Sequence, residues 1–185
     1  MSTDRTLNEI RAEFGRSRFI AMPIAGTLLW SVAGVLGAIL PAEQASFALF
    51  LCTGSIFPLG ILVSRFTGEN IMGAKSQNEL DRLFGLTILM ASLVWGIAIP
   101  FWLVEPSSLP LGVGILAGLM WIPLSWMIQH WVGYFHAIAR TVLIVAAWFL
   151  FPDQRFVIIP AIIVVIYLIS IAALERRYRG LSRAP

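Results

Sequence analysis

Long apolar segments separated by short polar connections dominate the chain. Glu43 is the only charged residue between positions 19 and 64, Glu105 is the only one between 83 and 139, and none lies between 156 and 174. A helix needs about 20 mostly apolar residues to cross the ~30 Å hydrocarbon layer of a bilayer, where it satisfies its own backbone hydrogen bonds. The pattern therefore predicts six spanning helices, over residues 19–40, 46–64, 83–104, 109–129, 133–151 and 156–174.

The spacing of these segments predicts an all-α, polytopic membrane protein. All connections are short except residues 65–82, so consecutive helices are expected to pack as antiparallel neighbours in one bundle. Composition agrees, because 58% of the 185 residues are hydrophobic and 12% are charged, against about 25% charged in soluble domains. A soluble globular fold and a disordered chain are excluded, and one cysteine, Cys52, rules out an internal disulfide.

The basic residues predict the orientation of the bundle. Eleven of the thirteen Lys and Arg residues lie in the segment 1–18, in the connection 65–82 or in the tail 175–185. Arg155 lies on the opposite side, and Arg140 lies within the fifth span. Because cytoplasmic loops are enriched in Lys and Arg, both termini are expected in the cytoplasm. The same bias explains the sequence pI of 9.6 without a nucleic-acid partner.

The segment 1–18 is expected to form a short amphipathic helix ahead of the first span. Thr6 and Glu9 have the spacing of a capping box, in which a hydroxyl and a carboxylate three residues later cap the helix reciprocally. Two interpretations stay open: a helix on the anionic surface of the membrane, or a lead-in to the span. The first span is expected to be retained, because its 22 residues exceed the ~7–15 of a signal-peptide core.

Proline and glycine mark places inside the predicted spans where helices break or pack closely. Pro58, Pro123 and Pro160 each remove a backbone donor, so they are candidate helix breaks of the kind that forms binding sites in transporters. Proline is also frequent in membrane helices without such a role. Gly114 and Gly118 form a G-x-x-x-G segment, which predicts close packing of another helix, within the bundle or in a second subunit.

Arg140 is the one basic residue placed inside a predicted span. It lies seven residues, or about 10 Å, into the span that begins at Gly133. An arginine at the centre of a membrane helix costs ~2.5–3.5 kcal/mol on insertion scales and keeps its charge. His136 lies four residues earlier on the same helix face. The environment of Arg140 therefore needs a specific explanation.

Two interpretations of Arg140 follow from the absence of any carboxylate within the spans. In the first, Arg140 helps to bind an anion or a lipid headgroup at a cytoplasm-facing site, together with His136, His130, Gln129 and Arg65. In the second, it is structural. Its protein partner would then be an acid of the long connection (Glu69, Glu79 or Asp81) or a carbonyl freed by Pro58 or Pro123.

The sequence contains no recognisable catalytic or metal-binding set. His130 and His136 are six residues apart, which is not a same-face spacing, and no Cys, Asp or Glu nearby completes a metal site. No cofactor is predicted, and an enzyme is less well supported than a binding protein. Trp95 and Trp121 lie deep in predicted spans, where they would line a cavity or pack in the core.

Three segments resemble an uncharacterised family of small bacterial integral membrane proteins. They are residues 50–70 (FLCTGSIFPLG, then SR and GEN), Pro123-Leu124-Ser125-Trp126 and the pattern over 7–14. The resemblance implies a multi-pass protein of the bacterial cytoplasmic (inner) membrane, and that family has no assigned activity.

Three functions are compatible with these features. The leading hypothesis is a small transporter, a channel-like protein or a protein that binds a solute or lipid, with an anionic lipid or a small anion as partner. The alternatives are a non-catalytic accessory protein that binds another protein, and a lipid-modifying enzyme. The bilayer itself is the expected environment, and homo-oligomers are compatible with the glycine motif.

Overall fold

The computed structural model describes residues 5–69 and 78–181, and every element in these ranges is helical. The elements are α1 (Leu7–Phe14), α2 (Ala21–Ile39), α3 (Ala42–Gly54), α4 (Ile56–Thr67), α5 (Glu79–Leu93), α6 (Trp95–Val104), α7 (Ser108–Leu116), α8 (Trp121–Ile128), α9 (Val132–Leu150), the 3-10 turn η1 (Pro152–Gln154) and α10 (Arg155–Leu181).

Within the described residues, five helical stretches are long and apolar enough to cross a membrane. They are Ala21–Ile39, Glu79–Val104, Ser108–Ile128, Val132–Leu150 and Pro152–Leu181. α3 and α4 reach that length only together, and they are bent by 44° at Ser55. The membrane-protein class follows from these helices, whereas the predicted number of six spans holds only if the bent pair is one span.

Three boundaries differ from the predicted spans because charged residues are compatible with helix ends. α5 begins at Glu79 rather than at Leu83, with two acidic residues in its first turn. α3 begins at Ala42 rather than at Ser46, since Glu43 lies in its first turn, where a negative charge favours the helix dipole. α10 continues past Leu174 to Leu181, with Arg179 in its last turn, where a positive charge is favourable. Placing span ends at charged residues therefore made these helices too short.

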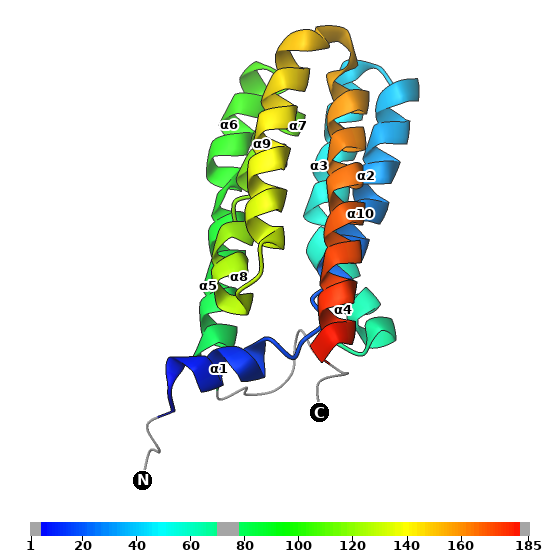
Figure 1. Cartoon of the computed structure of the whole chain (residues 1–185). Coiled ribbons are helices and arrows are strands. Elements are labelled where there is room, and N and C mark those ends of the chain that lie inside the picture. The colour runs from blue at the N-terminus through cyan, green and yellow to red at the C-terminus, as the bar shows by residue number, and fades with distance from the viewer. Residues whose placement is uncertain (1–4, 70–77, 182–185) are drawn as a thin grey trace.

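The helices form two groups that meet along α10. α2 packs against α3, α4 and α10, while α9 packs against α7, α8 and α10. α5 contacts α8 and α1, and α6 contacts α7. α4 and α5, which flank the long connection, are not among the helix pairs that pack extensively in the described residues. Figure 1 shows α1 and the C-terminal end of α10 at the same end of the bundle.

Three glycines bring α2 very close to α10. A Cβ atom on Gly26 would lie 2.6 Å from Cζ of Tyr167, and one on Gly34 would lie 3.1 Å from Cβ of Pro160. At Gly37 it would collide with the carbonyl oxygen of Phe156. Pro160 has no N–H to donate a hydrogen bond to that carbonyl oxygen, which lies one turn earlier in α10. The absence of a side chain at these three positions of α2 thus determines how closely the two helices pack.

Of the three prolines predicted to break helices, two lie next to an interruption in the structure. Pro58 and Pro123 are each the third residue of a helix, α4 and α8, that follows an interruption of the preceding helix. Proline is tolerated there because the first backbone N–H groups of a helix have no acceptor within it. α10 continues through Pro160. The break predicted at Pro160 is therefore wrong.

Polar contacts hold the end of the bundle that carries α1. Thr6 and Glu9 form the predicted capping box of α1, which is confirmed. Nε of Arg18 donates to a carboxylate oxygen of Glu175 at 2.7 Å, which links the start of α2 to the end of α10. Nη2 of Arg177 donates to the carbonyl of Gly15 at 2.6 Å, which joins the end of α10 to the end of α1.

Candidate functional site

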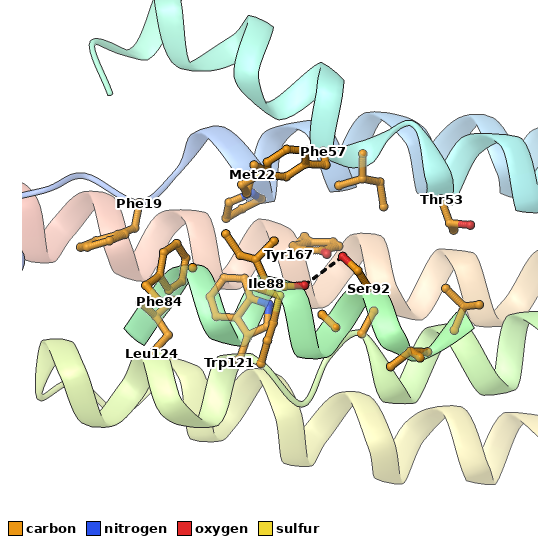
Figure 2. Close-up of a pocket in the computed structure, with 18 of the residues that line it drawn as sticks. Phe19, Met22, Thr53, Phe57, Phe84, Ile88, Ser92, Trp121, Leu124 and Tyr167 are labelled. Carbon is orange, nitrogen blue, oxygen red and sulfur yellow. Dashed lines mark hydrogen bonds between the residues drawn. The ribbon is translucent and has the colours of Figure 1, made fainter. Parts of the chain in front are cut away.

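A cavity of about 650 Å³ lies between the two groups of helices. Figure 2 shows Phe57 and Met22 on one side of it and Ile88 and Trp121 on the other, with Tyr167 between them. Its walls are mostly apolar, and the size falls in the ~300–1,000 Å³ range of sites for small organic ligands. We call this space the central cavity.

Polar side chains in the central cavity are few. Among the described lining residues, Arg140 is the one basic group and Glu69 and Asp81 are the acidic ones, while Ser17, Thr53, Ser92 and Tyr167 contribute hydroxyls. The hydroxyls of Thr53 and Ser92 each donate to a carbonyl of their own helix, at 2.7 and 3.0 Å. Arg140 is therefore the strongest donor that this wall offers to a bound molecule.

Arg140 is buried in the middle of α9. It is the ninth of 19 residues of that helix, so it lies about 12 Å beyond Val132 along the helix axis. Its side chain is 1% exposed. Nε donates to the carbonyl oxygen of Gly114 on α7, and Nη1 donates to Nε2 of His136, 3.2 Å away. The guanidinium is thus fixed to two helices.

His136 continues this hydrogen-bonded chain to α10. Its Nδ1 lies 2.9 Å from Oγ of Ser170, whose hydroxyl donates to the carbonyl of Ile166 at 2.8 Å. Because Arg140 can only donate, Nε2 of His136 must accept, and the ring proton is assigned to Nδ1. Trp121 stacks on the imidazole, with ring centroids 3.9 Å apart and planes within 8°. His136 is therefore held as a neutral acceptor that orients Arg140.

Small and aromatic residues shape the space around the guanidinium. A Cβ atom on Gly118 would lie 2.9 Å from Cδ of Arg140, so the side chain passes over this glycine. The Arg140 carbon Cζ lies 5.7 Å from the ring centroid of Trp30 and 5.4 Å from that of Tyr167. These distances are within cation–π range. The other glycine of the predicted motif, Gly114, packs instead against isoleucines of α9 and α10.

The positive charge of Arg140 has no protein counter-charge in the described residues. None of the ion pairs found there includes Arg140, and neither Glu69 nor Asp81 is bonded to it. Nη2 has no acceptor among the described residues, yet it is not a sealed buried atom. Because Arg140 lines the central cavity, a molecule in that space can reach its side chain.

The protein partners predicted for a structural Arg140 are not the ones that it has. Its carbonyl acceptor is Gly114, rather than a carbonyl one turn before Pro58 or Pro123. Glu69 instead accepts hydrogen bonds from the backbone N–H groups of Ile20 and Ala21, at 3.1 and 2.8 Å. The described end of the long connection is thus held by the start of α2, and not by Arg140.

The structure separates the other predicted site residues from the Arg140–His136 pair. Arg65 is exposed on α4. Gln129 is exposed and ends α8 in a left-handed conformation with a φ of 49°. His130 lines a different hollow, beside Arg176 and Arg177, where burial and the charge of Arg177 lower the pKa of its imidazole. Only His136 and Arg140 of the five lie together.

Residues that complete the surroundings of Arg140 were missed in the sequence. Ser170 and Tyr167 are the polar residues of an otherwise apolar segment, and their spacing of three puts them on one helix face. That spacing was the available signal. Trp95 and Trp121 both line the central cavity, which was one of their two predicted placements.

No group of three His, Cys, Asp or Glu residues that could hold a metal ion is found in residues 5–69 and 78–181.

The chain matches none of the curated proteins and none of the solved structures to which it was compared. A family model matches residues 7–177, which is most of the chain and includes all the residues of the central cavity. The chain therefore belongs to a family of unknown function, DUF7010.

Proposed function

We propose that this integral membrane protein binds an anionic amphiphile in the central cavity, with the anionic group at Arg140 and the apolar part along the walls. The walls are mostly apolar and include Trp30, Trp121 and Tyr167, which supports an apolar or aromatic body for the ligand. This proposal narrows the range of a transporter, channel-like or lipid-binding protein to one site and one kind of ligand.

The observation that carries the proposal is the buried, uncompensated charge of Arg140. A buried charge is costly unless it is paired and hydrogen-bonded. Here the protein supplies a carbonyl and a neutral imidazole but no carboxylate in the described residues. Ionisable residues inside membrane segments usually mark a functional site for this reason. An anion in the cavity would complete the environment of Arg140.

We also propose that the chain crosses the membrane six times, with both ends in the cytoplasm. We take α3 and α4 as one bent span, because an even number of crossings agrees with α1 and the end of α10 lying at the same end of the bundle. The concentration of Lys and Arg in residues 1–18, 65–82 and 175–185 supports a cytoplasmic position for that end, in a bacterial inner membrane.

Mass spectrometry of the purified chain tests the proposal. The full chain is extracted in a mild non-ionic detergent, and small molecules released on denaturation are identified. We expect an anionic amphiphile at close to one per chain. Ala91→Phe places a phenyl ring in the central cavity and is expected to remove most of it.

Ala38→Phe is the matched control, since Ala38 is exposed on α2 and the same ring there leaves the cavity open. This variant should retain the amphiphile. Equal retention by wild type and Ala91→Phe, or release of uncharged lipid alone, would contradict the proposed function.

A further inference from the structure

Building on the proposed function, we infer that the anionic group is a single carboxylate, so that the ligand of the central cavity is a lipophilic monocarboxylic acid. The inference names the chemical class of the molecule that Arg140 receives. It follows from the donors that Arg140 has left, from the charges along the cavity wall and from the position of the site within the bundle.

The first argument is the number of free donors. A guanidinium has five N–H groups, and Arg140 uses one on Gly114 and one on His136. Three remain, of which two are on Nη2. One N–H of Nη1 and one N–H of Nη2 run parallel at the outer edge of a guanidinium, and the two oxygens of one planar carboxylate can accept such a pair in the bidentate arrangement typical of arginine. A phosphate monoester has a third terminal oxygen, which lies outside such a planar pair of donors.

The second argument is the charge of the wall. The described residues that line the central cavity include one basic side chain, Arg140, and two acidic ones, Glu69 and Asp81. A monocarboxylate brings one negative charge, which Arg140 balances. A phosphate monoester brings about −1.5 to −2 at neutral pH and would leave negative charge unbalanced in an apolar space.

The third argument is access through an apolar layer. The cavity is lined from α4 by Ile56 and Phe57 and from α5 by Phe84 and Ile88. α4 and α5 do not pack extensively on each other in the described residues, and we take the seam between them as the route of entry from the bilayer. A carboxylic acid can pass such a layer in its neutral form, because desolvation raises a carboxyl pKa by several units. A phosphodiester stays charged, which disfavours a phospholipid headgroup at Arg140.

Quenching of tryptophan fluorescence by brominated probes tests the inference. Trp30, Trp95 and Trp121 line the central cavity, so a bromine-bearing chain bound there quenches them. Three probes are compared on the full chain in non-ionic detergent: dibromostearate, its methyl ester, and the phosphate monoester of dibromostearyl alcohol. We expect dibromostearate to bind at least about tenfold more tightly than the other two, as charge-assisted bidentate pairs allow.

Variants identify Arg140 as the source of the preference. Arg140→Gln is expected to abolish the difference between the acid and its ester, and Arg140→Lys to keep only part of it, because lysine lacks the planar fork. The control is Arg155→Gln, since Arg155 contacts Ser107 and Trp148 at the C-terminal end of α9 and lies outside the cavity. It should keep the full preference. The comparison of probes on the wild type stands even if an Arg140 variant fails to fold.

The outcomes separate the inference from the proposed function. Equal or tighter binding of the phosphate ester overturns the carboxylate assignment and leaves an anionic amphiphile in place. Equal binding of dibromostearate and its methyl ester overturns both the carboxylate assignment and the proposed function. Absence of quenching by every probe also overturns both. Preference for the acid, lost in Arg140→Gln and kept in Arg155→Gln, supports both.

Discussion

Glu69 caps α2 from 48 residues away, because its Oε1 accepts a hydrogen bond of 2.8 Å from the backbone N–H of Ala21. The same oxygen accepts from the N–H of Ile20, which is the N-cap residue and has no side chain able to cap. The carboxylate thus replaces a local cap and joins the described end of the long connection to the start of α2.

Removal of this distant cap should lower stability. Glu69→Ala leaves two N–H groups at the start of α2 without their acceptor, and loss of a cap costs about 0.5–2 kcal/mol. We expect a lower midpoint of thermal unfolding in detergent, with a smaller decrease for Glu69→Gln, which keeps an acceptor. Asp153→Ala, at the exposed η1 turn, serves as control. An equal midpoint for Glu69→Ala and wild type would show that the cap is not needed.

Gly118 should be intolerant of even a methyl group. A Cβ atom there lies 2.9 Å from Cδ of Arg140 and 3.1 Å from the carbonyl of Ile115, so Gly118→Ala must displace the buried guanidinium. Overpacking of this kind costs about 1–3 kcal/mol. Thermal unfolding checks the loss. Gly112→Ala, in the preceding helix α7, is the control, because a Cβ atom there meets nothing within 4 Å, and it should be neutral or stabilising.

The two glycines of α2 nearest η1 should differ in their sensitivity. Gly37→Ala is expected to destabilise strongly, because the new methyl group would meet the backbone oxygen of Phe156 and force α2 away from α10. Gly34→Ala meets Cβ of Pro160 at 3.1 Å, a contact that a shift of a few tenths of an ångström relieves. Chemical or thermal unfolding of the pair gives the order. A greater loss for Gly34→Ala would contradict the packing described for α2 and α10.

Replacement of His136 should depend on whether an acceptor remains. His136→Phe keeps a ring against Trp121 but leaves Nη1 of Arg140 without its acceptor, which costs about 1–3 kcal/mol or more for a charged donor. His136→Gln offers a carbonyl oxygen and should cost less. Unfolding midpoints of both variants provide the measurement. If the phenylalanine variant were the more stable of the two, packing rather than hydrogen bonding would explain the role of His136.

Acid should loosen α1 from the bundle. A hydrogen bond from Arg5, and then one from Asn78, lower the pKa of the exposed Glu13 below its usual range. This stabilisation is complete above the unfolded pKa, near pH 4, and is lost as the pH falls through the lower folded value. We expect faster amide exchange in α1, after correction for intrinsic rates, as the pH is lowered from about 5 to about 3. Glu13→Gln should reduce this dependence on pH while leaving exchange in α9 unchanged, and the remainder belongs to Glu9, whose pKa is also lowered by its hydrogen bonds with Thr6.

The membrane class of the fold could be predicted because it depends on the length of the apolar segments and on the scarcity of charges in them. Any chain with apolar segments near 20 residues and so few charges must place them in a bilayer. The ends of the helices could not be read from charges, since Glu43 and Arg179 stabilise helix termini instead of ending them. The bend at Ser55 has no unique signal in the sequence. A proline follows the interruptions before α4 and α8, but α10 continues through its own proline without one.

The candidate site was predictable at its centre and not at its edges. Arg140 and His136 stood out because helical spacing puts two polar residues on one face of an apolar segment. The acceptor on Gly114 depends on how α7 packs on α9, which no local pattern specifies. Gln129 and His130 were grouped with them by depth, but the left-handed turn at Gln129 directs this part of the chain elsewhere. Depth along the sequence does not determine direction around a helix.

The position of Arg140 along α9 has an electrical consequence. It lies eight positions after Val132 and ten before Leu150, which is near the midpoint of the helix. Moving one elementary charge through a whole membrane changes its energy by about 2.3 kcal/mol per 100 mV. A negative charge that reaches Arg140 from either aqueous side crosses roughly half of that field, which is about 1 kcal/mol per 100 mV. Occupancy of the central cavity would then follow the membrane potential, changing roughly five- to tenfold per 100 mV.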